Sequence, residues 1–435
     1  MTRIAVVGAG LAGLAAARDL AAAGHEVAVL ESTDGVGGKV RASEVGGQLV
    51  DEGADSMLRR VPWGVDLATS LGLELVAPAT GEASIWTDVL RPMPLGTVMG
   101  IPTDLAAVRD LVGDVVETVA GPVTEDLSVG ALVRSRLGHA VADRLVDPLL
   151  GGVYAGTADG LSVRATLPQL WPHLASHDSL LEAARAARGT PAPGPVFAQT
   201  AGSLGLLPGR AAEGLDVRLG TTVRGLARTQ SGWRLETGSA ASPAFVEAEA
   251  VVLAVPAAPA SRLLKGHLPV DELAAVSYAS IAIVTLVLDG ASPGAGSGYL
   301  IPAVTGRTTK AVTFTSRKWG RPGPAVVRAS VGRAGEESTL QREDGELVDS
   351  VWTELRAALG DLPHLVDSRV TRWGGGLPQY APGHLDLVER LRGALPRTLA
   401  VAGAAYDGVG VPAVIRSGQE AARRVLSDLQ QETRR

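Results

Sequence analysis

The stretch Ile4-Ala5-Val6-Val7-Gly8-Ala9-Gly10-Leu11-Ala12-Gly13 decides the fold of the chain. Its apolar start predicts a buried strand, and its three glycines predict a tight turn. The alanine- and leucine-rich residues 14–23 predict a helix that stops before Gly24. A second apolar strand over residues 27–30 leads to Glu31. Strand, turn, helix and strand in this order predict a parallel βαβ unit and therefore an α/β fold.

Each glycine of this turn has a physical reason. Gly8 permits the sharp turn, Gly10 lets the backbone approach a pyrophosphate, and Gly13 lets the helix pack closely on the strand. The pyrophosphate would lie at the helix N-terminus, where free N–H groups and the helix dipole favour an anion. Glu31 follows at the distance where an acid accepts hydrogen bonds from ribose hydroxyls. The context favours dinucleotide binding over an ordinary glycine-containing turn, with these candidates: Gly8, Ala9, Gly10, Leu11, Ala12, Gly13 and Glu31.

The residues that follow Glu31 indicate which dinucleotide is bound. They read Ser32-Thr33-Asp34-Gly35-Val36-Gly37-Gly38-Lys39-Val40-Arg41. A second glycine pair and two cations have no use in an NAD site, but a longer cofactor that lies along the protein can use both. The pattern resembles the FAD fingerprint of the amine oxidase and protoporphyrinogen oxidase superfamily. We therefore expect FAD, with Ser32, Gly38, Lys39 and Arg41 as further contacts.

Composition limits the class of protein. A chain of 435 residues predicts two or three domains, and 46% hydrophobic with 20% charged residues is typical of a soluble globular protein. A net charge of −6 argues against a nucleic-acid partner. The absence of cysteine excludes disulfides and a cysteine-linked flavin, so FAD would be bound non-covalently, and it fits the cytoplasm. The longest apolar run, Ile281–Leu288, is strand-sized, so we expect no transmembrane segment and leave peripheral membrane contact open.

The middle of the chain changes from strand to helix patterns. Residues 42–56 predict a hairpin around Gly46-Gly47. Helical periodicity then marks four segments: Val61–Leu71, Leu105–Val119, Ser128–Leu149 and Ser179–Ala187. His173 and His177 have a spacing that could suit a metal, but no third ligand is in register, so we expect exposed histidines and no metal site.

Strand patterns return in the second half. Short strands are predicted at residues 217–219 and 222–226, a meander over residues 233–247, and a buried strand over residues 250–255 that rejoins the nucleotide sheet. The region 266–384 predicts a second sheet, from the strands 281–288, 311–315 and 325–331, with an amphipathic helix over residues 343–359. Residues 399–412 repeat the strand and glycine turn before a helix over 413–426, so a second helix N-terminus points at a ligand.

Three further segments carry a more specific resemblance. Residues 147–165 contain Gly-Gly-Val-Tyr-Ala-Gly, residues 377–384 read Leu-Pro-Gln-Tyr-Ala-Pro-Gly-His, and residues 403–412 contain the last glycine turn. Together they resemble the oxygen-dependent coproporphyrinogen III and protoporphyrinogen IX oxidases. That resemblance implies transfer of a hydride from a porphyrinogen to FAD, with O2 as the final acceptor and H2O2 as a product.

The resemblance also implies roles for particular residues. It puts Gly53, Ala54, Asp55 and Ser56 beside the flavin ring and gives the backbone of Val223 to the adenine. It puts Val409, Gly410 and Val411 over the ribityl chain and one edge of the flavin, whereas Ala404 replaces a polar residue of many relatives. No side chain can be named as the catalytic base, so the catalytic residue stays unknown.

We therefore expect a discontinuous Rossmann-like FAD-binding domain (1–82, 200–265 and 385–435), an inserted helical domain (83–199) and a sheet-rich substrate domain (266–384, with parts of 83–199). Coproporphyrinogen III is the expected substrate, because its four propionates make it more water-soluble than protoporphyrinogen IX. Cations available in the substrate region are Lys310, Arg317, Lys318 and Arg321, although a solvated loop explains them equally well. Protoporphyrinogen IX oxidation, another FAD amine oxidase or desaturase activity, and a redox-silent flavin-binding partner stay open, as does the oligomeric state.

Overall fold

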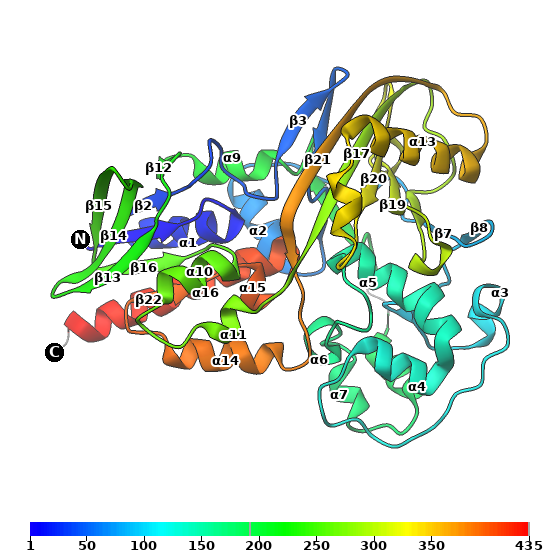
Figure 1. Ribbon diagram of the computed structural model, residues 1–435, viewed down its shortest axis with the longest axis horizontal. Coiled ribbons are helices and arrows are strands. Elements are labelled where there is room, and N and C mark those ends of the chain that lie inside the picture. Colours follow the sequence, from blue (N-terminus) through cyan, green and yellow to red (C-terminus); the bar gives the residue numbers. More distant parts are fainter. Residues whose placement is uncertain (191–192, 434–435) are drawn as a thin grey trace.

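The computed structural model describes residues 1–190 and 193–433, without the side chains of 432 and 433. Figure 1 shows two parts joined by long strands. One part contains both ends of the described chain and the parallel sheet. The other contains a large mixed sheet above a group of helices. The long strands β17 (Tyr278–Asp289) and β21 (His364–Pro378) run from the first part into the second.

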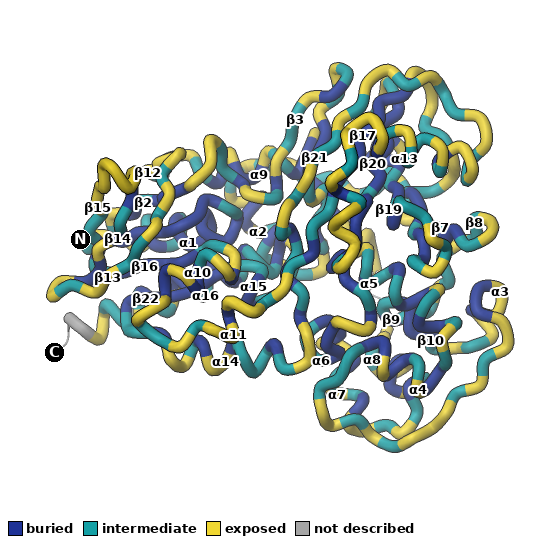
Figure 2. Tube along the Cα trace, viewed as in Figure 1, coloured by how far each residue is buried: buried dark blue, intermediate teal, exposed yellow. Residues whose placement is uncertain are grey.

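A parallel sheet forms the centre of the first part. Among the described residues it has five strands in the order β12-β2-β1-β16-β22, all parallel. Their bounds are β1 Arg3–Val7, β2 Glu26–Leu30, β12 Asp216–Arg218, β16 Ala250–Leu253 and β22 Leu399–Val401. Segments far apart in the sequence therefore meet side by side, and the predicted return of residues 250–255 to the nucleotide sheet is confirmed. Figure 2 shows the inner strands of this sheet mostly as dark blue, buried chain, whereas the edge strand β12 is exposed or half-buried.

Helices cover both faces of this sheet. Helix α1 (Leu11–Ala22) and helix α16 (Val411–Thr433) bury small apolar side chains against one face. On the other face lie α10 (Ala257–Leu264), α14 (His384–Ala394) and the meander of β13 (Gly225–Thr229), β14 (Gly232–Ser239) and β15 (Ser242–Ala248). Strands buried on both faces explain why β1 and β16 read as continuous apolar runs.

The second sheet has seven strands within the described residues, in the order β21-β17-β20-β19-β18-β7-β8. Its remaining bounds are β20 Ala325–Val331, β19 Thr309–Phe314, β18 Gly298–Leu300, β7 Ser84–Trp86 and β8 Leu90–Pro92. Only the pair β18 and β7 is parallel among these pairings. Helix α13 (Asp344–Leu359) packs on one face through Leu347, Val351 and Leu355. The amphipathic helix predicted over residues 343–359 is confirmed.

Helices dominate residues 109–188, around a core of their own. They are α3 (Arg109–Val112), α4 (Val129–Val141) with a π-helical turn over Ala142–Val146, α5 (Asp147–Tyr154), α6 (Val163–Thr166), α7 (Trp171–Leu174) and α8 (Leu180–Arg188). Ser128, Ser162 and Ser179 cap α4, α6 and α8, each by accepting a backbone N–H of the first turn. The division of the chain at the expected domain boundaries stays a prediction.

Short elements complete the fold. The predicted hairpin is confirmed as β3 (Ala42–Val45) and β4 (Gln48–Asp51). Other strands are β5 Met57–Leu58, β6 Leu75–Val76, β9 Thr97–Val98, β10 Ile101–Pro102 and β11 Phe197–Thr200, and other helices are α2 Pro62–Ser70, α9 Leu206–Ala212, α11 Asp271–Ala274, α12 Thr315–Lys318 and α15 Ala404–Asp407. No helix in the described part of the chain is long and apolar enough to cross a membrane.

Two expected elements were wrong. The helix predicted over Leu105–Val119 is only a short 3-10 turn (Ala106–Val108) and α3, because Gly113 at φ +76° ends the helix. The strand predicted over residues 222–226 begins only at Gly225. The residues before it turn toward β2 instead, where the Thr221 N–H donates to the Glu31 carbonyl at 2.7 Å.

Candidate cofactor and substrate site

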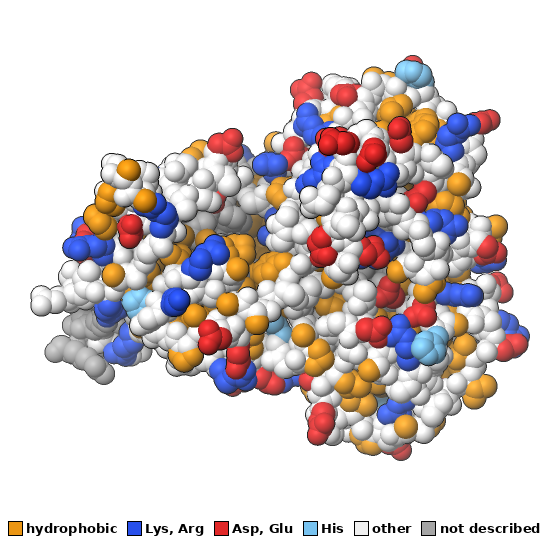
Figure 3. Space-filling view, viewed as in Figure 1, with side chains coloured by type: hydrophobic (Ala, Val, Ile, Leu, Met, Phe, Trp, Pro, Cys, Tyr) orange, Lys and Arg blue, Asp and Glu red, His pale blue; other side chains and the backbone are white. Residues whose placement is uncertain are grey.

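A cavity of about 460 Å³ lies at the carboxyl ends of the parallel strands. Residues that end β1, β2, β16 and β22 all contribute to its wall: Val7, Gly8, Leu30, Glu31, Ala254, Ala402 and Gly403. This edge of an open α/β sheet is where such folds bind their ligands. Figure 3 shows hydrophobic side chains gathered in a hollow between the two parts of the molecule. The apolar lining of the cavity includes Val255, Pro256, Pro259 and Leu263.

The first glycine turn leaves room where a pyrophosphate would lie. Helix α1 begins at Leu11, and Gly10 precedes it with no side-chain cap. A Cβ atom built on Gly10 would meet no atom within 4 Å, whereas one on Gly13 would lie 1.9 Å from the carbonyl oxygen of Gly8. Gly13 therefore serves helix–strand packing, and the space beside Gly10 is open to a ligand at the helix N-terminus.

Glu31 is fixed at the end of β2 by its neighbours. Its Oε2 accepts the Ala9 N–H at 2.8 Å, and its Oε1 accepts the backbone N–H and the hydroxyl of Thr33, each at 2.9 Å. A carboxylate has about four acceptor positions. Since Oε2 holds a single bond, it can still accept a ribose hydroxyl from the cavity.

The second glycine segment folds back on the first. The Gly37 N–H donates to the Ala9 carbonyl at 2.8 Å, and Gly37 has φ +105°, a backbone conformation that favours glycine. Gly38 and Lys39 line the cavity. The Lys39 side chain has no hydrogen-bond or ion-pair partner among the described residues, and burial lowers its pKa. An ammonium without a partner in this cavity fits an anionic ligand.

Asp55, in the loop 53–56 next to this segment, is the centre of an ion-pair cluster. A Cβ atom on Gly53 would lie 2.1 Å from the Lys39 carbonyl oxygen, so the two segments are in contact. Asp55 lies between Lys318 (3.1 Å) and Arg328 (3.3 Å), and Ser56 donates to Asp55 at 3.0 Å. Although burial opposes it, the two cations lower the pKa of Asp55 to about 2. The Arg328 guanidinium also donates to the Gly53 carbonyl, so this cluster fixes the loop that was expected beside the flavin ring.

The other expected contacts lie at different places. Val223 lines the cavity. Arg41 does not, because its guanidinium lies 2.6 Å from Glu52 and over the Trp373 ring. Val409 packs against the helical core, Gly410 is exposed, and Val411 is buried at the start of α16, which reaches the cavity through its fourth residue, Val414. Contact of these residues with FAD stays a prediction.

Sequence reasoning missed part of the wall. Arg262 comes from α10, and Tyr278 and Pro378 come from the two long strands where they leave the first part of the molecule. The Tyr278 hydroxyl accepts the Ala257 N–H at 2.8 Å, and burial raises its pKa. One signal was available: a strand that returns to the sheet places the residues after it, such as Val255 and Pro256, at the same carboxyl edge.

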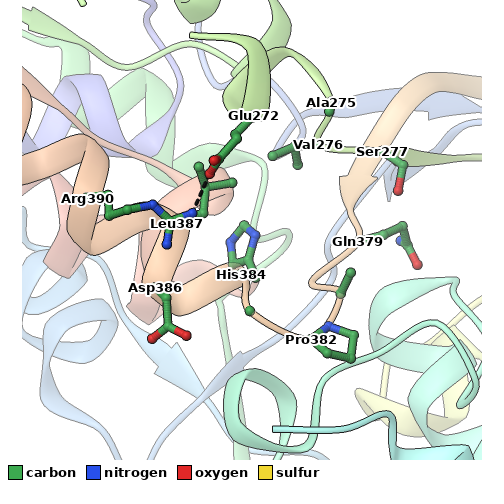
Figure 4. Close-up of a pocket in the computed structure, with 12 residues that line it drawn as sticks. Glu272, Ala275, Val276, Ser277, Gln379, Pro382, His384, Asp386, Leu387 and Arg390 are labelled. Carbon is green, nitrogen blue, oxygen red and sulfur yellow. Dashed lines mark hydrogen bonds and ion pairs between the residues drawn. The ribbon is translucent and has the colours of Figure 1, made fainter. Parts of the chain in front are cut away.

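A second groove, of about 350 Å³, lies between α11 and α14. Figure 4 shows its charged side chains, with Glu272 paired to Arg390 across the groove. Asp386 at its border pairs with Arg164 at 2.6 Å. These charges already have partners, and Gly383, which precedes α14 at the groove, donates its N–H to Asp126 at 3.0 Å. The groove therefore does not compete with the first cavity as a dinucleotide site.

The parallel sheet, the two glycine segments and the joined mixed sheet define a two-part flavoprotein oxidoreductase. Comparison with known proteins agrees: the chain belongs to the flavin containing amine oxidoreductase family, whose model matches residues 11–426.

The chain is also similar to individual members of this family. The coproporphyrinogen III oxidase of Mycobacterium leprae is 38% identical, with 99% of this chain and 98% of the relative covered. The coproporphyrinogen III oxidase of Bacillus subtilis is 29% identical, with 98% of each chain covered. A crystal structure from Exiguobacterium sp. 255-15, of a protein provisionally named protoporphyrinogen oxidase, superposes with a TM-score of 0.85 at 31% identity, covering 99% of both chains. Cyclohexylamine oxidase from Brevibacterium oxydans shares the fold, with a TM-score of 0.74 at 18% identity over 99% of both chains.

Proposed function

We propose that this chain is an FAD-dependent oxidase that dehydrogenates coproporphyrinogen III to coproporphyrin III, with O2 as acceptor and H2O2 as product. The observation that carries the proposal is the full-length match to coproporphyrinogen III oxidases, joined to a cavity that suits a dinucleotide. The cytoplasm is the proposed compartment, since the chain has no cysteine to oxidise.

The proposed cofactor is FAD held without a covalent bond. The residues that would hold it are the turn at Gly8–Gly13, Glu31 for the ribose, Lys39 for an anionic oxygen, and the segment around Val223 for the adenine. When bound, FAD supplies a hydride acceptor for the bridging carbon of the porphyrinogen.

The protein itself positions and encloses the reactants. The cluster of Asp55, Lys318 and Arg328 ties the loop at Gly53 to the central strand β20, so this loop is held rigidly beside the proposed ring position. The start of α16 contributes the partial positive charge of a helix N-terminus, which stabilises negative charge nearby. No side chain in this arrangement is proposed as a catalytic base.

Substrate choice is the second point to test, because the chain is similar both to coproporphyrinogen III oxidases and to a protein provisionally named protoporphyrinogen oxidase. We expect a higher kcat/KM for coproporphyrinogen III than for protoporphyrinogen IX at matched detergent, with peroxide released in both reactions. A tenfold preference for protoporphyrinogen IX would overturn the substrate assignment. Failure to oxidise either compound by the FAD-loaded protein would leave a redox-silent flavin protein.

A further inference from the structure

The two faces of the seven-stranded sheet differ. Val312 and Ala329 lie on the face that packs against α13. The register places Thr285, Arg328 and Thr313 in one row on the opposite face, and Ile283, Ser330 and Ala311 in the next. Ser330 and Ala311 are only half-buried although β19 and β20 are interior strands. Arg328 of the first row bonds to the loop at Gly53, so this second face is the one that looks toward the proposed flavin position.

A bulge turns one lysine onto this face. Thr309 pairs with Val331 and Ala311 pairs with Ser330, so Lys310 between them has no partner on β20. Such a bulge redirects a side chain. Lys310 is 5% exposed, and its Nζ lies 3.4 Å from the Gly151 carbonyl oxygen of α5.

The charge of Lys310 has no counter-ion. Among the residues that the structure describes, no carboxylate lies within ion-pair distance of its Nζ. The charged groups that act on it are Arg333 and Glu336, which pair with each other at 3.4 Å. Asp147 of α5 accepts the Ala158 N–H and interacts with Arg333. Burial and then the like charge of Arg333 lower the pKa of Lys310 to about 7. Burying an ammonium in this way is costly unless a partner arrives.

The part of α5 that Lys310 contacts consists of glycines. Residues 151 and 152 of α5 are glycines, and a Cβ atom on Gly152 would lie 3.4 Å from Leu300 Cδ2 of β18. Gly152 is exposed, and Val153 beside it is 44% exposed. Lys310 therefore contacts the backbone of a glycine pair, and the second glycine of that pair is at the surface.

We propose that Lys310 binds a carboxylate of the substrate and so is a specificity-determining residue, an inference that rests on the proposed function. Lys310 on β19 lies opposite residues 330–331 of the neighbouring strand β20, two to three residues beyond Arg328. The strand spacing and the rise per residue place the Cα atoms of Lys310 and Arg328 roughly 9 Å apart. A substrate that reacts near the loop at Gly53 can extend a peripheral carboxylate across the sheet to Lys310. Coproporphyrinogen III carries such groups on four sides.

The test distinguishes loss of the Lys310 charge from a change in the shape of the site and from loss of folding. Lys310→Met is compared with the wild-type protein, using coproporphyrinogen III and its uncharged tetramethyl ester in the same detergent. We expect KM for the acid to rise roughly tenfold, as for one lost charge-assisted contact, with kcat and the KM for the ester nearly unchanged. Lys265→Met is the matched control, because Lys265 is an exposed lysine outside this sheet.

Equilibrium binding of coproporphyrin III, followed by its fluorescence, repeats the comparison without turnover, so it reports on Lys310 even if the wild-type protein oxidises nothing. Should Lys310→Met lack a cooperative melting transition, Lys310→Gln, which keeps a donor for the Gly151 carbonyl, replaces it with the same expectations. Unchanged affinity for the acid with a lower Tm would overturn the proposal, because Lys310 would then only cap the last turn of α5. Equal losses for acid and ester would overturn it as well.

Discussion

The cofactor half and the substrate half of this molecule use the chain differently. The dinucleotide cavity is formed mostly by backbone groups: an open helix N-terminus at Gly10 and a folded-back segment at Gly37. One acid, Glu31, adds a side chain that is held by backbone N–H groups. On the substrate side, charged side chains from a loop, a helix and a strand far apart in the sequence form the structure, as in the cluster of Asp55, Lys318 and Arg328. A site built from backbone leaves local sequence patterns, whereas a site built from side chains far apart in the sequence leaves few.

The largest expected effect is at the backbone-built site. Gly10→Val should abolish FAD binding, since the new side chain would fill the open space at the start of α1. Gly345→Val is the matched control, because a Cβ atom there also meets nothing within 4 Å but faces solvent on α13. Absorbance of bound flavin after gel filtration measures the outcome. If Gly10→Val retained a full complement of FAD, the open space at Gly10 would not be the pyrophosphate site.

Breaking the side-chain cluster should come next in size. Asp55→Asn leaves Lys318 and Arg328 without a counter-charge and should lower the free energy of unfolding by about 3–5 kcal/mol at pH 7. Asp34→Asn, at an exposed acid, serves as control. Denaturant unfolding of the three proteins gives the values, and equal stabilities would show that the cluster contributes nothing.

The contribution of Asp55 to the free energy of unfolding depends on pH. The pKa of Asp55 is about 2 in the folded protein, below its ordinary value of 3.8, so its charge stabilises the fold above about pH 4. That contribution is lost as the pH falls through 2. The stability difference between the wild-type protein and Asp55→Asn should therefore shrink below pH 4, and a constant difference down to pH 2 would contradict the assignment.

A smaller effect is expected at Glu31. Glu31→Ala should weaken FAD binding by about 1.5–3 kcal/mol, through loss of a charge-assisted hydrogen bond to ribose, with the fold kept. Glu26→Ala, at the exposed opposite end of β2, should bind FAD as the wild-type protein does. Titration of the apoproteins with FAD compares them. An unchanged Kd for Glu31→Ala would mean that Glu31 only fixes the turn at Ala9 and Thr33.

The smallest effect is expected at Gly152 of α5, on the substrate side. Gly152→Ala should raise the stability of the apoprotein by about 0.4–1 kcal/mol, because alanine favours a helix and its Cβ makes only ordinary contact with Leu300. It should also raise KM for the porphyrinogen, since it adds a side chain to an open surface of α5. Melting curves and initial rates test both parts. A higher Tm without any change in KM would remove α5 from the substrate surface.

The sequence predicted the features that depend on local chemistry. The turn at Gly8–Gly13, the returning strand β16 and helix α13 follow from glycine positions and hydrophobic period, and all three are present. Arg41 was expected at the cavity but pairs with Glu52, because β4 brings an acid to it that sequence spacing alone does not reveal. Tyr278 and Pro378 join the cavity from strands hundreds of residues away, and the bulge that turns Lys310 exists only in the pairing of β19 with β20.

Electron transfer from coproporphyrinogen III to the flavin can be followed by mixing the FAD-loaded protein with this compound without oxygen, and then admitting air. We expect the flavin absorbance to bleach on mixing, and to return with air as coproporphyrin fluorescence rises and peroxide appears. Flavin that stays oxidised in the presence of excess coproporphyrinogen III would contradict the proposed function.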